Sequence, residues 1–130
     1  MAASLLLDTH ALLWRLAQPE KLSPLAYSAI NDPAATVFVS AASGWELATK
    51  ARLGKLPGVE PLLHDLPVLL QQQGFQLLPI QLQHGLRAGG DAQLHRDPFD
   101  RLLAAQAELE MPQLVSIDPA LAGFPCRLLW

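Results

Sequence analysis

Residues 4–16, SLLLDTHALLWRL, hold an apolar run that ends at an acid and continues at once into a helical pattern. Ser4–Leu7 is typical of a short buried strand stopped by a polar cluster. Residues 10–16 are apolar on most sides and predict a helix directly after that strand. Further strands are predicted at 36–39, 75–80 and 114–117, with an edge strand at 127–129. Because strands that alternate with helices pair in parallel through crossovers, we predict an α/β sandwich around a central sheet.

Capping residues and glycines predict where the helices begin and end. Helix starts are indicated by three signals: Ser23-Pro24, the capping-box pair Ser43 and Glu46, and Asp97-Pro98. Gly54 and Gly74 are natural helix ends. The other predicted helices cover 61–73, bent or broken before Pro67, and 81–88, followed by a loop at Gly89-Gly90-Asp91.

Length and composition indicate one globular domain spanning residues 1–130. The single cysteine, Cys126, excludes an internal disulfide framework and fits a reducing compartment. Asp8, His10 and Arg15 interrupt the apolar start, which argues against a signal peptide and a membrane span. We therefore expect a cytoplasmic protein with no membrane partner.

The formal net charge of −3 taken alone argues against a nucleic-acid partner. If four acids are set apart as ligands of a cation, the remainder is about +1 (−3 + 4). The charge balance therefore neither favours nor excludes nucleic acid.

Those four acids lie at predicted strand ends or in the first turn of a neighbouring helix: Asp8, Glu46, Asp100 and Asp118. In open parallel sheets the active cleft lies off the carboxyl ends of the strands, so all four can face it. Two carboxylates about 5 Å apart repel by roughly 3 kcal/mol at an effective dielectric of 20, so such a cluster needs a cation. Mg²⁺ or Mn²⁺ suits an all-oxygen site. Zn²⁺ is disfavoured because there is no cysteine pair and the histidines lack ligand spacing; we expect His10 and His95 to be structural or substrate-facing.

Each acid also has a purely structural explanation. Asp8 is placed to cap the following helix, and Asp118 before Pro119 to form a turn. Glu46 is placed to pair with Lys50 or to complete the capping box. For Asp97 we favour the capping role. Five cations lie near the acids in sequence, and among them Arg101 is the preferred phosphate contact because it adjoins Asp100: Lys50, Arg52, Lys55, Arg96 and Arg101.

Three long motifs in this order resemble one known family. They are Leu6–Trp14, Ser40–Lys50 with its Ser-Gly-Trp-Glu core followed by Gly54-Lys55-Leu56, and His95–Ala107 with its Asp-Pro-Phe-Asp-Arg core. They are similar to the PIN-domain toxins of type II toxin–antitoxin modules, the VapC group. The resemblance implies a single PIN-like α/β/α sandwich with a mainly parallel sheet of four to five strands. It also implies a Mg²⁺-dependent endoribonuclease, with Mn²⁺ as an alternative ion, that is inhibited by a cognate antitoxin.

The resemblance assigns roles to particular residues. Asp8, Glu46 and Asp100 match the family's core acids and Asp118 its weaker fourth acid, so these four are the expected catalytic residues. Asp8 and Asp100 are expected to bind the metal directly. The expected substrate contacts are Thr9, Arg101 and Ser116. The expected partners are RNA, an antitoxin and a second copy of the chain, with operator DNA reached only through the antitoxin.

Two other functions are compatible with the residues alone. A phosphatase of the haloacid-dehalogenase type also begins with an acid after its first strand, but it normally has a second aspartate where this chain has His10. An interaction module would use the acidic cleft only to receive basic peptide arms. The sequence encodes no readable preference for an RNA or a cut site, and it leaves the number of metal ions and the dimer face open.

Overall fold

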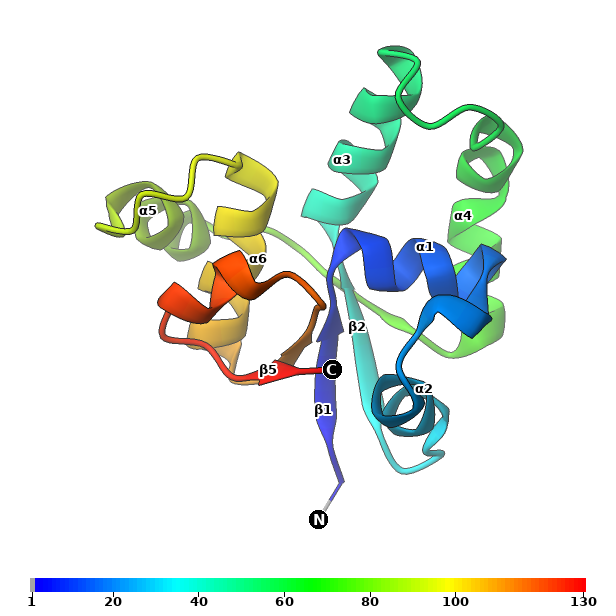
Figure 1. The fold of residues 1–130 in the computed structure, drawn as a ribbon, viewed down its shortest axis with the longest axis horizontal. Helices are drawn as coiled ribbons and strands as arrows, with labels where there is room; N and C mark the ends of the chain where they lie inside the picture. The colour runs from blue at the N-terminus through cyan, green and yellow to red at the C-terminus, as the bar shows by residue number, and fades with distance from the viewer. Residues whose placement is uncertain (1) are drawn as a thin grey trace.

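The computed structural model describes residues 2–130 and has a five-stranded sheet at its centre (Figure 1). The strands are β1 (Ser4–Leu7), β2 (Thr36–Ser40), β3 (Gln76–Leu78), β4 (Gln113–Val115) and β5 (Leu128–Leu129). All four neighbouring pairs are parallel, and the order across the sheet is β3-β2-β1-β4-β5. The predicted α/β fold with a parallel sheet is confirmed, including β5 at the edge. The predicted domain began at residue 1, which lies outside the described residues.

Six α-helices and two 3-10 helices connect these strands within residues 2–130. They are α1 (Thr9–Ala17), η1 (Pro19–Lys21), α2 (Pro24–Asn31), α3 (Ala41–Arg52), α4 (Glu60–Gln73), α5 (Leu82–Gly90), α6 (Pro98–Glu110) and η2 (Pro119–Gly123). Within this part of the chain no helix combines the length and the apolar character that a bilayer crossing requires.

The core has two halves because successive side chains of a strand point to opposite faces of the sheet. Leu5 and Leu7 of β1 pack on one face with apolar side chains of α1, α2 and α4. Leu6, between them, packs on the other face with side chains of α6 and η2. Figure 1 shows α1, α2 and α4 on one side of the sheet and α5 and α6 on the other. The apolar run of residues 5–7 is therefore buried from both sides, as expected for a central parallel strand.

The strand order reverses beside β1. The chain runs from β1 outward through β2 to β3, and then returns to the opposite side of β1 to form β4 and β5. The carboxyl ends of β1 and β4 therefore adjoin at the switch point, which is where open α/β sheets bind ligands. Asp8 follows β1 and Ser116 follows β4, so the topology places the predicted site residues there.

Three details of the predicted helices differ from the structure, two of them helix boundaries. Helix α3 begins earlier than expected because the Ser40 hydroxyl accepts the Ala42 N–H at 2.9 Å and acts as the N-cap, so Ser43 lies inside the helix and the predicted capping box is absent. Gly89 and Gly90 form the last turn of α5 instead of a loop. Packing of α5 on α6, with Ala88 buried between them, outweighs the low helix propensity of glycine there.

The third difference is in α4, which runs through Pro67 as one helix, so the break considered before Pro67 is absent. Leu63 and Leu66 before the proline and Leu70 after it all pack against the core, so tertiary contacts hold both halves of the helix on the sheet. Pro67 itself is exposed. The helix ends as predicted at Gly74, whose φ of 73° is the left-handed conformation that favours glycine.

Candidate metal centre

Asp8 is fixed at the switch point by both its backbone and its side chain. Its N–H donates to the Val115 carbonyl of β4 at 3.1 Å. Its Oδ1 accepts the Ala11 N–H at 2.7 Å and caps α1. The capping role that the sequence left open is therefore real, but it uses only one of the two carboxylate oxygens. Asp8 is buried, with 5% of its surface exposed.

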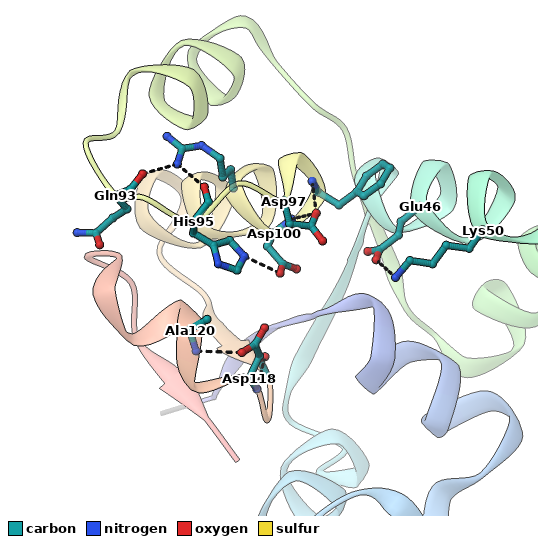
Figure 2. A network of polar contacts seen from close by, with 11 residues as sticks. Glu46, Lys50, Gln93, His95, Asp97, Asp100, Asp118 and Ala120 are labelled. Atoms are coloured by element: carbon teal, nitrogen blue, oxygen red, sulfur yellow. Dashed lines mark hydrogen bonds and ion pairs between the residues drawn. The ribbon is translucent and has the colours of Figure 1, made fainter. Parts of the chain in front are cut away.

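Asp118 emerges from the neighbouring strand, at the same edge of the sheet. Its N–H donates to the Ser116 hydroxyl at 3.1 Å, and its Oδ1 accepts the Ala120 N–H at 2.9 Å to cap η2. This is the turn geometry that the sequence suggested. It also presents the carboxylate toward Asp100 at the start of α6, as Figure 2 shows.

Asp100 occupies the first turn of α6, three residues after the N-cap. Asp97 makes that cap, since its Oδ1 accepts the N–H groups of Phe99 at 2.9 Å and Asp100 at 3.3 Å. The capping role predicted for Asp97 is confirmed. The Asp100 side chain points back toward the connector between α5 and α6, where its Oδ2 lies 2.9 Å from His95 Nε2.

Glu46 is the most buried of these acids, with 3% of its surface exposed. Lys50, one turn further along α3, places its Nζ 2.5 Å from Glu46 Oε2, so the ion pair considered from the sequence is present. Glu46 Oε1 is also buried, and it has no hydrogen-bond partner within residues 2–130. In Figure 2 the Glu46 carboxylate points toward Asp100. A buried carboxylate oxygen without a partner is costly, so the position favours a ligand that supplies positive charge.

The pKa values of Asp8 and Asp100 are both raised, and the charge of Glu46 contributes to both shifts. Burial raises the pKa of Asp100 to about 6, with the negative charges of Asp97 and Glu46 adding to the effect and the His95 hydrogen bond opposing it. Burial also raises the pKa of Asp8, against hydrogen bonds from Ser116 and Ala11, and the charge of Glu46 raises it further. Glu46 therefore acts on both aspartates. A group of carboxylates whose charged forms are disfavoured in this way is a natural receptor for a cation.

The closest convergence of ligand atoms includes a residue that was not predicted as a ligand. One atom each of His95, Asp100 and Asp118 lies within 4.8 Å of the others, and all three residues are half-buried. Within residues 2–130 neither Asp8 nor Glu46 belongs to a group this tight. The predicted metal pair of Asp8 and Asp100 stays a prediction. His95 could have been found, because it opens the Asp-Pro-Phe-Asp-Arg motif stretch.

The polar groups of the three residues predicted to contact substrate make hydrogen bonds within the protein. Thr9 is buried and donates its hydroxyl to Ser43 Oγ at 3.1 Å, which ties α1 to α3. Ser116 is 3% exposed. The Arg101 guanidinium donates to the backbone carbonyls of Ala88, Asp91, Gln93 and His95 at 2.6 to 2.8 Å.

Arg101 also lies over the ring of Phe124, with its central carbon 5.8 Å from the ring centroid. Four of its five N–H donors are thus used in fixing the α5–α6 connector. Its role as a phosphate contact stays a prediction, and the structure gives it a positioning role.

Comparison with known proteins gives a family match and two similar proteins. The family model described as PIN domain matches residues 5–123. Ribonuclease VapC16 of Mycobacterium tuberculosis (strain ATCC 25618 / H37Rv) is 35% identical over an alignment of 75 residues. The match covers 52% of this chain and 53% of that protein. The match thus spans about half the length of that relative.

The second similar protein resembles this chain in its fold. The crystal structure of VapBC2 from Rickettsia felis bound to a DNA fragment from their promoter superimposes with a TM-score of 0.68. The match has 16% sequence identity and covers 98% of this chain and 97% of that chain. At this identity the likeness concerns the fold, and it extends over nearly every element described above.

Proposed function

The chain belongs to the PIN-domain family, and on this premise we propose that it is a metal-dependent endoribonuclease, the toxin of a type II toxin–antitoxin pair that acts in the cytoplasm. The observation that carries the proposal is a set of linked acids beside the switch point of the sheet. Asp100 lies close to Asp118, and the charge of Glu46 acts on both Asp8 and Asp100. One of them, Glu46, keeps a buried oxygen without a hydrogen-bond partner within residues 2–130. The similarity to a protein named as a ribonuclease supports the same reaction class.

The residues present fit a divalent cation. They offer hard oxygen donors, buried carboxylates whose charged forms are disfavoured chiefly by burial, and one oxygen that has no hydrogen-bond partner within residues 2–130. We propose that Asp8 and Asp100 hold Mg²⁺ or Mn²⁺, and that Glu46 and Asp118 complete the acidic site. When bound, the ion lowers the pKa of a water and stabilises negative charge on a phosphoryl oxygen.

The protein's own part is positioning. The α1 cap fixes the Asp8 carboxylate and the η2 cap fixes that of Asp118, so the backbone sets the direction of both groups. Asp100 is held by His95 in the first turn of α6. Lys50 holds Oε2 of Glu46, which leaves Oε1 as the oxygen to orient a water. Preorganised groups of this kind need little rearrangement when the reaction begins.

Cleavage of RNA by the purified protein tests the proposal. With Mn²⁺ or Mg²⁺ present we expect new RNA ends, and the exchanges Asp8→Asn and Asp100→Asn should lower the rate by more than about a hundredfold. Asp32→Asn is the matched control, because Asp32 is an exposed acid at the end of α2. Unchanged cleavage in both site variants would exclude the proposed centre. Metal-stimulated turnover would also exclude a module that only binds basic peptides.

The proposed partner is an antitoxin that places a basic side chain against the acids. A guanidinium paired with carboxylates is strong once water is excluded, so an arginine would compete with the cation for the same oxygens. Inhibition should then weaken as the concentration of Mn²⁺ rises. Inhibition that is independent of the metal concentration would show that the antitoxin acts elsewhere. We further propose a homodimer and a toxin–antitoxin hetero-oligomer, with operator DNA bound through the antitoxin.

A further inference from the structure

His95 places an imidazole nitrogen beside the carboxylates of the candidate metal centre. It comes from the connector between α5 and α6, and its Nε2 lies 2.9 Å from Asp100 Oδ2. Together with an Asp118 oxygen these atoms lie within 4.8 Å of one another. Figure 2 shows the imidazole of His95 directed toward the Asp100 carboxylate, with Asp118 below them.

The position of the imidazole is set by the surrounding structure. Arg101 donates to the His95 carbonyl at 2.8 Å and to three further carbonyls of α5 and the connector. The Phe124 ring meets the imidazole at an interplanar angle of 88°, with the ring centroids 5.9 Å apart. His95 is therefore held at the site by contacts on its backbone and on its ring.

The spacing matches the coordination of a small divalent ion. Neighbouring ligands of an octahedral ion lie about 3 Å apart when each is about 2.1 Å from the metal. The separation of His95 Nε2 and Asp100 Oδ2 is of this size. A cation could thus replace the shared hydrogen with little movement of either side chain.

A second observation points to a cation in the same space. Glu46 Oε1 is buried without a hydrogen-bond partner in residues 2–130, and its carboxylate is directed toward Asp100 from the opposite side (Figure 2). A histidine hydrogen-bonded to Asp100 does not explain this oxygen, because His95 contacts Asp100 and not Glu46. A cation between Glu46 and the His95–Asp100 pair would give Glu46 Oε1 a partner and would also account for the closeness of His95 Nε2 and Asp100 Oδ2.

We propose that His95 is a direct nitrogen ligand of the metal, beside oxygens of Asp100 and Asp118, so that the site prefers a first-row transition cation such as Mn²⁺ to Mg²⁺. The inference rests on the proposed metal-dependent function and names its cation more closely. Imidazole is a poor partner for Mg²⁺ and a common ligand of transition metals. Coordination through Nε2 uses the neutral tautomer that carries its hydrogen on Nδ1.

The test is electron paramagnetic resonance of the full chain loaded with Mn²⁺, with pulsed detection of nitrogen coupled to the metal. We expect directly coordinated ¹⁴N in the wild type and in His64→Gln, an exposed histidine on α4, and none in His95→Gln. His95→Gln should also weaken Mn²⁺ binding by about tenfold or more. The affinity for Mg²⁺, measured by competition, should change much less.

A wild-type Mn²⁺ complex without coordinated nitrogen would overturn the inference, and His95 would then only hydrogen-bond Asp100. The nitrogen coupling is measured on the wild-type protein, so a folding defect in His95→Gln leaves the test intact. If RNA is cleaved but nitrogen coupling is absent, the proposed function stands and the inference fails. If nitrogen coupling is present but no metal supports cleavage, the proposed function fails and the ligand assignment stands. Absence of Mn²⁺ binding would contradict both.

Discussion

Asp100 lies where the folded protein favours its protonated form. Burial, together with the charges of Asp97 and Glu46, raises its pKa from 3.8 to about 6. Between about pH 4 and pH 6 the folded chain therefore binds more protons at this group than the unfolded chain does. The free energy of unfolding of the metal-free protein should fall as the pH rises through that window. Solvent screens this partly exposed carboxylate, so its contribution should stay below about 3 kcal/mol. Asp8, whose pKa is also raised, acts in the same direction.

Unfolding in urea with EDTA, repeated from pH 4 to pH 7, checks this expectation. Asp100→Asn should flatten the decline and make the metal-free protein more stable than the wild type at pH 7. Glu20→Gln is a suitable control, because Glu20 is an exposed acid on η1. Stability that rises across the window in the wild type and not in Asp100→Asn would contradict the assigned pKa.

Arg101 allows its two possible roles to be separated by a conservative exchange. Arg101→Lys keeps the charge but loses most of the fork that reaches the carbonyls of Ala88, Asp91, Gln93 and His95. We expect stability to fall by about 2 kcal/mol, as several buried acceptors lose their donor. Hydrogen exchange should quicken in the connector 91–97, and kcat should fall more than KM rises. Arg96 is an exposed neighbour in the same connector, and Arg96→Lys should leave stability, hydrogen exchange, kcat and KM unchanged.

A phosphate contact would give the opposite pattern. In that case Arg101→Lys would leave stability and exchange rates unchanged, and the loss would appear in RNA affinity alone.

At the level of elements, strong local signals predicted boundaries well, and competing signals were resolved by packing. Ser23-Pro24 and Asp97-Pro98 have no rival nearby, and both helices begin there. Ser40 and Ser43 are both good N-caps, and the end of β2 selects Ser40 because the chain leaves the sheet at that residue. Gly89 and Gly90 suggest a loop locally, but the contact of α5 with α6 extends the helix. No sequence pattern reports such contacts between distant elements.

The ion pair on α3 is predicted to compete with the metal. Glu46 is nearly inaccessible, so removing Lys50 leaves its carboxylate without a compensating charge. Lys50→Met should therefore lower the stability of the metal-free protein by about 2 kcal/mol. The rise in Tm on adding Mn²⁺ should be larger than in the wild type, because Glu46 becomes fully available to the cation.

Thermal melts of Lys50→Met with EDTA and with Mn²⁺ measure both effects. Arg52→Met, which removes an exposed charge from the same helix, should leave the Mn²⁺ effect as in the wild type. A smaller Mn²⁺ effect in Lys50→Met would show that Lys50 supports the metal site.

For the whole molecule, the family was predicted from the motifs and the parallel sheet from the alternation of strands with helices, and both are confirmed. Asp8, Asp100 and Asp118 could be found because they follow a strand or lie in the first turn of a helix, positions that one sequence can reveal. Glu46 lies in the second turn of α3 and not in the first, so its predicted position was wrong although it belongs to the acidic group. The finer geometry could not be found. His95 reaches Asp100 through a connector fixed by Arg101, and the strand order that places β4 beside β1 depends on pairings across more than a hundred residues.

A cation at this centre should stabilise the molecule across its switch point. The acids come from the end of β1, from α3, from α6 and from the end of β4, so one ion links both halves of the sheet. A metal concentration of about 100 times Kd should add about 2.7 kcal/mol, and raise Tm by about 8 to 10 °C. EDTA should reverse the rise, and Asp100→Asn should abolish it. Hydrogen exchange should slow at 91–97 and 116–123 while α2 stays unchanged; a uniform slowing that includes α2 would mean that the ion acts through global stability alone.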